Sequence, residues 1–339
     1  MLRLPRFSYR RPASAREAAA LVAERPQDTV LLAGGTDLLP KLKRRQLVAR
    51  VLVDVRHLPE LAGIRSGPAG AIEVGGGVTL AAAAGDRTLV GVHPGYAAAA
   101  GQVSSPPLRE AGTIGGNLCV DTRCNYYDMG EEWRRAIGYC LKKDGVQCLV
   151  APGSSRCWAV SSSDTAPMAI ALQGVVVLVG PDGERELPAA ALYRDDGIEY
   201  LAKRPWEVVA SLRLPAPPGR RSAYVKLRRR GSIDFPIAGA AVALDLDGPV
   251  IVSGRIVLSA VGSSPVEATA AAAFLTGRPL DEETILEAAR LAAGPAKPLD
   301  NADGSHFWRK RMVRVVVEQA LRAAAPVASA VVASAARSV

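Results

Sequence analysis

The chain has 339 residues, of which 49% are hydrophobic and 22% charged, and its 42 basic and 33 acidic side chains give a net charge of +9. This composition excludes global disorder and predicts two or three domains, since single hydrophobic cores rarely exceed about 250–300 residues. Aromatic residues make up only 5% and the basic residues are scattered, which argues against a nucleic-acid-binding surface with stacking aromatics.

No segment predicts a membrane helix. The longest apolar stretch spans residues 166–180, which is shorter than the roughly 20 residues that a membrane helix needs. The first 14 residues lack the apolar core of a signal peptide. We therefore expect a cytoplasmic protein with no membrane contact, in which structural disulfides are rare.

The first 55 residues predict a small α/β unit. Residues 12–26 have apolar residues at helical spacing, with Ser14 as a candidate N-cap and Glu17 three residues later, the pattern of a capping box. Residues 29–45 then predict a strand, a glycine turn and a helix, and residues 51–61 a strand followed by a turn.

Residues 56–215 predict a larger unit. Residues 71–85 indicate a strand, a glycine break and a helix start. Residues 93–118 indicate a helix that leads into a second glycine turn, and residues 168–180 a short helix and a strand.

The Pro/Gly-rich segment 213–222 is the best candidate for a domain boundary. Beyond it the sequence predicts three strands and then three helices, in the order 223–230, 238–248, 250–261, 267–277, 281–293 and 304–325. Strands followed by helices indicate an α+β domain at 220–325. We expect the low-complexity residues 326–339 to form a flexible tail.

Two glycine-rich segments are candidates for binding a phosphate: Ala33–Asp37 (AGGTD) and Thr113–Asn117 (TIGGN). Paired glycines let the backbone approach a ligand closely, and successive N–H groups can then form an anion-binding nest. Each segment alone is more commonly an ordinary tight turn. Neither matches the Rossmann or P-loop motif.

All five cysteines fall within residues 119–157. From the residues alone they could form a disulfide framework, a zinc site, an iron–sulfur cluster or ordinary buried thiols. The expected cytoplasmic location argues against disulfides. Zinc sites are typically built from two close C-x2–4-C pairs, whereas Cys119 and Cys124 are the only two cysteines of this sequence with such a spacing.

Taken together, the segments resemble a known family, the FAD-binding subunits of the molybdenum hydroxylases, the xanthine and carbon monoxide dehydrogenase group. The resemblance lies in the AGG and TIGGN segments and in the stretches at 7–24, 104–117, 224–244 and 259–268. It implies an α+β fold with a two-part FAD-binding domain of the vanillyl-alcohol-oxidase (PCMH) type, a small subdomain at 1–55 and a larger one at 56–215. The C-terminal domain is expected to have a three-stranded sheet and helices.

The same resemblance implies how FAD is bound. Residues of the two glycine segments would wrap the diphosphate: Ala33, Gly34, Gly35, Thr36, Asp37, Thr113, Gly115, Gly116 and Asn117. Val103 and Ser104 would lie near the flavin, and Asp164 would bind a ribitol or ribose hydroxyl. Tyr224 would lie against the isoalloxazine ring, with Lys226 on the same strand face. A buried core role for Tyr224 and an N-cap role for Asp164 are the alternatives.

The cysteine segment, about 119–160, resembles an insert in one branch of the family, the flavin subunit of 4-hydroxybenzoyl-CoA reductase. That branch binds an additional [4Fe–4S] cluster through C-x15-C-x7-C-x8-C. The matching positions here are Cys124, Cys140, Cys148 and Cys157, and four thiolates are what a cubane cluster requires. Cys119 is expected to be a buried bystander thiol.

The resemblance implies an electron-transfer subunit of a larger molybdenum enzyme. A large molybdenum-cofactor subunit and a small subunit with [2Fe–2S] clusters would complete a dimer of heterotrimers, a heterohexamer, with ferredoxin as electron donor. One alternative is the flavin subunit of another molybdenum hydroxylase, which oxidises an N-heterocycle, an aldehyde or an acyl-CoA. A remote alternative is a non-enzymatic basic protein with a structural zinc site.

Overall fold

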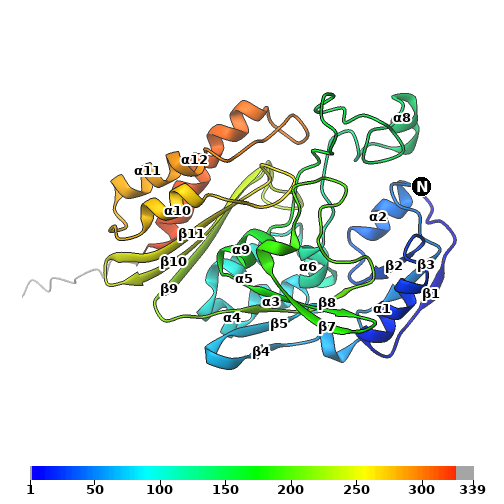
Figure 1. Cartoon of the computed structure of the whole chain (residues 1–339), viewed down its shortest axis with the longest axis horizontal. Helices are drawn as coiled ribbons and strands as arrows, with labels where there is room; N and C mark the ends of the chain where they lie inside the picture. The colour runs from blue at the N-terminus through cyan, green and yellow to red at the C-terminus, as the bar shows by residue number, and fades with distance from the viewer. Residues whose placement is uncertain (1, 326–339) are drawn as a thin grey trace, which may run out of the picture.

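The computed structural model describes residues 2–325, so the predicted tail at 326–339 lies outside the described residues. The chain forms three sheets with helices between and around them (Figure 1). This mixed helix-and-sheet architecture confirms the predicted α+β class. No described helix is long and apolar enough to cross a membrane.

The first sheet is small and parallel, with the strand order β1-β3-β2. Its elements are β1 (Ser8–Arg10), α1 (Ala15–Glu24), β2 (Thr29–Leu32), α2 (Leu38–Lys43) and β3 (Val51–Asp54). Helix α1 begins as predicted, because the Ser14 side chain accepts a hydrogen bond from the backbone N–H of Glu17 at 3.1 Å. The glycine segment Ala33–Asp37 links β2 to α2.

The second sheet is antiparallel, with the order β4-β5-β8-β6-β7. Its strands are β4 (Ile64–Ser66), β5 (Ile72–Gly75), β6 (Val175–Gly180), β7 (Gly183–Pro188) and β8 (Val208–Leu214). A run of helices lies between β5 and β6: α3 (Leu80–Gly85), α4 (Arg87–Val92), α5 (Pro94–Gly101), α6 (Pro106–Ala111), α7 (Ile114–Leu118), α8 (Glu131–Ala136) and α9 (Thr165–Ala171). Short 3-10 turns occur at η1 (Pro59–Leu61), η2 (Pro68–Gly70) and η3 (Ala189–Leu192).

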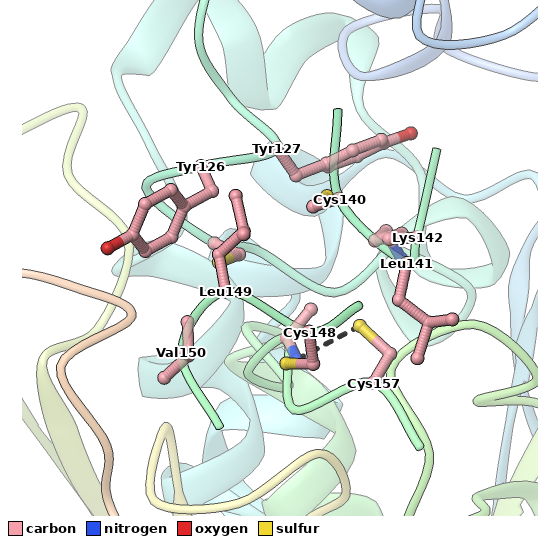
Figure 2. Close-up of a pocket in the computed structure, with 11 residues that line it drawn as sticks. Tyr126, Tyr127, Cys140, Leu141, Lys142, Cys148, Leu149, Val150 and Cys157 are labelled. Atoms are coloured by element: carbon pink, nitrogen blue, oxygen red, sulfur yellow. Dashed lines mark hydrogen bonds between the residues drawn. The ribbon is translucent and has the colours of Figure 1, made fainter. Parts of the chain in front are cut away.

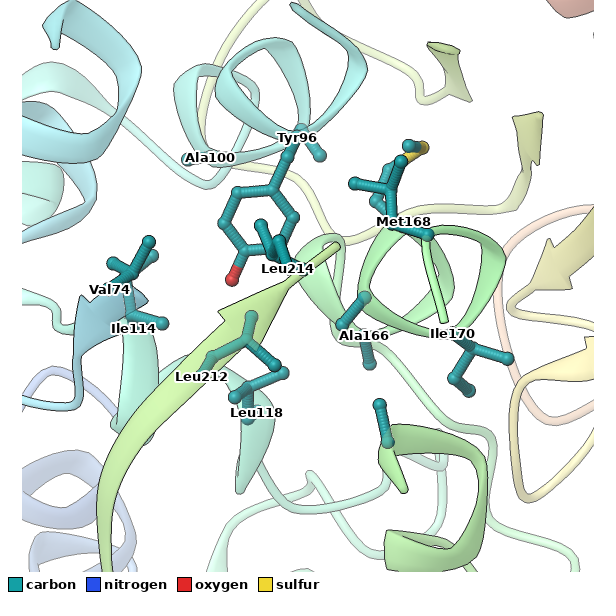
Figure 3. Packing of buried hydrophobic residues seen from close by; sticks show 14 of the residues in the cluster. Val74, Tyr96, Ala100, Ile114, Leu118, Ala166, Met168, Ile170, Leu212 and Leu214 are labelled. Atoms are coloured by element: carbon teal, nitrogen blue, oxygen red, sulfur yellow. The ribbon is translucent and has the colours of Figure 1, made fainter. Parts of the chain in front are cut away.

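Most of these helices pack on the second sheet in one apolar core (Figure 3). Tyr96 of α5, Met168 of α9 and Leu212 of β8 are all fully buried there. Helix α8 is different, because it belongs to the cysteine segment and projects beside α2, away from this core (Figure 1). The cysteine segment between α7 and α9 therefore lies outside the core of the second sheet.

The third sheet is antiparallel and has four strands, not the three predicted. They are β9 (Arg220–Leu227), β10 (Ala238–Asp247), β11 (Val250–Ser259) and β12 (Val266–Glu267), in the order β12-β11-β10-β9. The additional strand β12 was missed because two residues are too short to show an alternating pattern. The three predicted helices are present as α10 (Thr269–Leu275), α11 (Glu282–Ala292) and α12 (His306–Ala324).

This third sheet is buried on both faces because successive side chains of a strand point to opposite sides. Tyr224, Ala241 and Val257 face the core of the second sheet. Ala240 and Val242 face the other way, into a separate core with α10, α11 and α12. The C-terminal domain thus presents one face of β9 and β10 directly to the helices α5 and α9.

The first glycine segment is in direct backbone contact with the two residues that precede the second segment, Ala111 and Gly112. A Cβ atom placed on Gly34 would lie 2.0 Å from the carbonyl oxygen of Ala111 and 2.8 Å from the Cα of Gly112. Only glycine allows this approach. The contact brings the small parallel sheet against the start of the second segment.

We expect Gly34→Ala to lower the free energy of unfolding by about 1–3 kcal/mol, the usual cost of overpacking. Gly91→Ala is the matched control, because a Cβ there meets no atom within 4 Å and alanine favours a helix by roughly 1 kcal/mol over glycine. Denaturant unfolding of both variants tests this. Equal stability of Gly34→Ala and the parent would contradict the close contact.

A buried carboxylate links two strands of the first sheet. Asp54 of β3 accepts hydrogen bonds from the hydroxyl of Tyr9 on β1 and from Arg56, whose Nη2 lies 3.0 Å away. Burial alone would raise the pKa of Asp54, but the bonds from Arg56 and Tyr9 lower it to about 2. The carboxylate therefore stabilises the fold above the ordinary aspartate pKa of about 4, and this contribution is lost as the pH falls from about 4 to about 2.

We expect Asp54→Asn to be less stable than the parent at neutral pH and to lose less stability between about pH 4 and pH 2. Unfolding curves at a series of pH values measure this difference. Asp182→Asn, in the exposed turn between β6 and β7, should follow the parent. Parallel curves for Asp54→Asn and the parent would contradict the assigned role.

Candidate functional site

The first glycine segment provides backbone donors for an anion. Gly35 has φ +71°, a left-handed conformation that favours glycine. Among the described residues we find no acceptor for the N–H groups of Gly34, Gly35 and Thr36. The side-chain oxygen of Thr36 faces Gly112, at 3.5 Å from a Cβ built there. These free amides suit a phosphate group.

The second segment is not the turn that the sequence predicted. Residues Ile114–Leu118 form helix α7, with Thr113 as its N-cap. The N–H of Gly115 donates to the carbonyl of Gly76 at 2.8 Å, and the N–H of Gly116 donates to the Thr113 side chain at 3.1 Å. The amides of residues 114–117 are all taken by protein acceptors, so the predicted nest of successive free amides at 113–117 is wrong.

Asn117 caps the N-terminus of α9, a role that the sequence suggested for Asp164. The side-chain oxygen of Asn117 accepts hydrogen bonds from Ser163 at 2.9 Å and from the hydroxyl of Thr165 at 2.7 Å. It also accepts from the backbone N–H of Thr165 at 3.2 Å. Asp164 itself makes no side-chain cap bond to α9, so the alternative N-cap role is not what the structure shows.

Asp164 instead forms a buried cluster with the C-terminal sheet. Its carboxylate accepts hydrogen bonds from the Tyr224 hydroxyl at 2.7 Å and the Lys226 ammonium at 2.8 Å. Burial raises the pKa of Asp164 and lowers the pKa of Lys226, and each charge partly offsets the effect on the other. Burial likewise raises the pKa of Tyr224. Three residues predicted to lie at the FAD are thus brought together.

Strand β9 and the residues that follow it hold the segment 102–104, part of which is predicted to lie near the flavin. The carbonyl of Gln102 accepts hydrogen bonds from Lys226 and from Arg228, both at 3.0 Å. The next two residues are Val103 and Ser104, and Ser104 has φ +48°, which is strained for a residue other than glycine. The carbonyl of Ser104 accepts from the backbone N–H of Ile233 at 2.9 Å. The C-terminal domain therefore determines the shape of 102–104.

The cysteine segment places four of its five thiols around one pocket. Cys124, Cys140, Cys148 and Cys157 line one small pocket, and each residue is at least nine-tenths buried. Figure 2 shows Cys140, Cys148 and Cys157 around this pocket, with Tyr127 and Leu149 among its walls. Cys119 does not line it. The sequence predicted this division of four thiols and one.

The four thiols of the pocket are not arranged with the geometry of a metal site. Within residues 2–325 no group of three or more His, Cys, Asp or Glu side chains is arranged as a metal site. No disulfide joins the cysteines, which are all free thiols. Burial raises the pKa of Cys124 to about 12 and that of Cys157 to about 11, since a lone thiolate is costly in an apolar wall.

The donor set nevertheless suits a soft metal or an iron–sulfur group. The other pocket residues are apolar or aromatic, with one lysine: Tyr126, Tyr127, Leu141, Lys142, Leu149, Val150 and Ala159. The N–H of Ala159 donates to the Cys157 sulfur at 3.4 Å. Gly197 lies so close that a Cβ there would be 2.6 Å from that sulfur. Hydrogen bonds to sulfur and exclusion of water are features that tune iron–sulfur clusters.

A network of buried charges attaches this pocket to the first glycine segment. Asp37 pairs with Arg123 and, at 3.2 Å, with Lys41. Lys41 also pairs with Asp121, which pairs with Lys142 at 2.7 Å in the pocket wall. Burial would raise the pKa of Asp121, but the ammonium groups of Lys142 and Lys41 lower it to about 2. The predicted diphosphate loop and the cysteine pocket are thus neighbours.

The C-terminal domain holds the pocket from the other side. Asn301 accepts a hydrogen bond from the N–H of Asn125 through its carbonyl, at 2.9 Å, and its side chain donates to the carbonyl of Trp158. These partners directly follow Cys124 and Cys157. The fully buried Arg309 of α12 donates to Asn301 at 3.1 Å and so fixes it. An open cleft of about 320 Å³, lined by Cys124, Phe235 and Asn301 among others, adjoins this contact.

Sequence reasoning missed the residues of these contacts. Lys41 lies in the basic run 41–45, whose charge would favour an exposed surface, yet Lys41 is buried. Asp121, Lys142 and Asn301 belong to no motif. Their partners are distant in sequence, so no local pattern could reveal them.

Comparison with known proteins gives the same assignment for both parts of the chain. Residues 5–217 match the family described as the FAD binding domain in molybdopterin dehydrogenase. Residues 222–324 match the CO dehydrogenase flavoprotein C-terminal domain.

Individual relatives span nearly the whole chain. The medium chain of carbon monoxide dehydrogenase from Afipia carboxidovorans is 30% identical, over 94% of this chain and 96% of its own. The FAD-binding subunit of Escherichia coli aldehyde oxidoreductase is 31% identical, over 80% of this chain and 86% of its own. Among solved structures, a chain of carbon monoxide dehydrogenase from Oligotropha carboxidovorans has the same fold as this protein. The TM-score is 0.78 and the identity 28%, over 95% of this chain and 98% of that one.

These matches cover both sheets of the FAD-binding part and the C-terminal domain, and they confirm the predicted oxidoreductase class. The chain belongs to the FAD-binding subunits of the molybdenum hydroxylase family.

Proposed function

We propose that this chain is a flavin and iron–sulfur electron-transfer subunit, with a [4Fe–4S] cluster held by Cys124, Cys140, Cys148 and Cys157. The observation that carries the proposal is the shared pocket of these four buried cysteines. A cubane cluster takes four thiolates and is sensitive to water and to hydrogen bonds at sulfur. When bound, FAD and the cluster supply stepwise electron transfer.

The chain's own residues position FAD. The free amides of Gly34, Gly35 and Thr36 are suited to the diphosphate, beside Asp37 and the Thr113–Asn117 segment with its residues Gly115 and Gly116. Asp164, Tyr224 and Lys226 form a hydrogen-bonded cluster that also fixes the segment before Val103 and Ser104. In this proposal these three residues orient the flavin end of FAD, and the buried carboxylate of Asp164 accepts a hydrogen bond from a sugar hydroxyl.

Within the family, the insert at about 119–160 favours 4-hydroxybenzoyl-CoA reductase as the complete enzyme. That enzyme removes a phenolic hydroxyl as water from an aromatic acyl-CoA, using electrons from reduced ferredoxin. The partners would be a large molybdenum subunit and a small [2Fe–2S] subunit in a dimer of heterotrimers. Binding of electron carriers would be aided by the net charge of +9.

The second candidate is the flavin subunit of another molybdenum hydroxylase. The relatives at about 30% identity favour it, because they include subunits of carbon monoxide dehydrogenase and aldehyde oxidoreductase. In that case electrons would leave through the flavin instead of entering from ferredoxin.

The cluster assignment is tested by quantifying iron, sulfide and flavin in the complex purified anaerobically with its partners. We expect Cys140→Ser to lose roughly four irons per FAD relative to the parent, as one cubane cluster requires, and to retain FAD. Using the difference removes the contribution of iron on other subunits.

Cys119→Ser is the matched control and should keep both iron and FAD, since Cys119 lies outside the pocket. Zinc in place of iron would identify a structural zinc site. No change of metal content in Cys140→Ser would show that the thiols are not ligands.

The identity of the whole enzyme is tested by substrate. We expect the purified complex to dehydroxylate 4-hydroxybenzoyl-CoA with reduced ferredoxin, measured as formation of benzoyl-CoA. Oxidation of carbon monoxide or an aldehyde with a dye acceptor, in the absence of that reaction, would instead establish the second candidate.

A further inference from the structure

One buried charge in the cysteine pocket has no role in the function proposed above. Lys142 is the only charged side chain among the described residues that line the pocket. Its side chain is 6% exposed. A buried ammonium is costly unless it is fully hydrogen-bonded, so its neighbours define what it does.

The ammonium of Lys142 is held by three oxygens. It donates to the Asp121 carboxylate and to the Thr122 hydroxyl, both at 2.7 Å, and to the carbonyl of Gly197. An ammonium has three N–H donors, so each one has a partner.

Two aromatic rings also face this ammonium. The ring centroids of Tyr127 and Tyr200 lie 4.9 and 5.5 Å from its nitrogen, within the range of cation–π attraction. Lys142 is therefore fixed in position and cannot turn to solvent.

The carboxylate of Asp121, which pairs with Lys142, also pairs with a second lysine. Asp121 is shared with Lys41, which also pairs with Asp37 at 3.2 Å. Toward the pocket, Lys142 follows Cys140 by two residues, and its Gly197 contact lies against the sulfur of Cys157. The ammonium of Lys142 therefore lies between Asp121 and the glycine that packs against this sulfur.

We propose that Lys142 is a positioning residue that sets the reduction potential of the redox group in the cysteine pocket; this rests on the proposed function. One-electron reduction by a reduced iron–sulfur protein adds one negative charge to that group, with no bond broken. A fixed positive charge in a wall of low dielectric favours the more negative form. Lys142 therefore raises the potential and makes the pocket a better electron acceptor.

The test is a potentiometric titration of the complete complex, following the electron paramagnetic resonance signal of the reduced cluster. Lys142→Met removes the charge and keeps the length of the side chain, so we expect a shift of the midpoint to more negative potential. Lys142→Arg keeps the charge, so its midpoint should lie close to the parent value. An unchanged midpoint in a Lys142→Met complex that retains its iron would overturn the proposal.

Lys143→Met is the matched control. Lys143 is the adjacent lysine, does not line the pocket and pairs with the exposed Asp144 at 2.9 Å. Its loss removes the same formal charge from the same loop, so the midpoint should stay at the parent value. A shift equal to that of Lys142→Met would show a general charge effect and would overturn the specific role.

Asp121→Asn keeps the proposal testable if Lys142→Met loses its iron. This variant leaves Lys142 in place and removes the adjacent negative charge, so the midpoint should move to more positive potential. An unchanged or more negative midpoint would overturn the proposal. Equal iron contents in the parent and Cys140→Ser complexes would instead refute the cluster assignment itself, which separates the two failures.

Discussion

The site depends on the chain of buried charges that runs from Asp37 through Lys41 and Asp121 to Lys142. A segment such as the cysteine insert has little apolar surface of its own, because only a small cluster of buried residues surrounds its thiols. Isolated buried charges are costly, so each member holds its neighbour in place. The network therefore fixes the cysteine segment against the first glycine segment more specifically than apolar packing could.

A second constraint comes from the C-terminal sheet, which is buried on both faces. One face of β9 belongs to the core of the C-terminal helices, whereas the other supplies Tyr224 and Lys226 to Asp164. The C-terminal domain, which carries no glycine segment, thus holds Asp164 and the carbonyl of Gln102 in place. This explains why the two matched domains, residues 5–217 and 222–324, form one functional unit.

Local patterns predicted the elements well, because caps and periodicity act over a few residues. The N-cap Ser14 of α1 is one example. The segment Thr113–Asn117 was misread as a turn, since adjacent glycines are poor helix formers. Its glycines serve tertiary contact instead: a Cβ on Gly115 would lie 2.9 Å from the carbonyl of Gly76. Lys41 escaped prediction because its partner Asp121 lies 80 residues away.

The contact of Asn301 has a consequence for the order in which the molecule matures. Asn301 is translated 143 residues after Trp158, whose carbonyl it binds, and it also holds the residue that follows Cys124. While the chain is being synthesised, the cysteine loop leaves the ribosome without this support. The support that Asn125 and Trp158 receive from Asn301 can therefore form only after residue 301 has been synthesised.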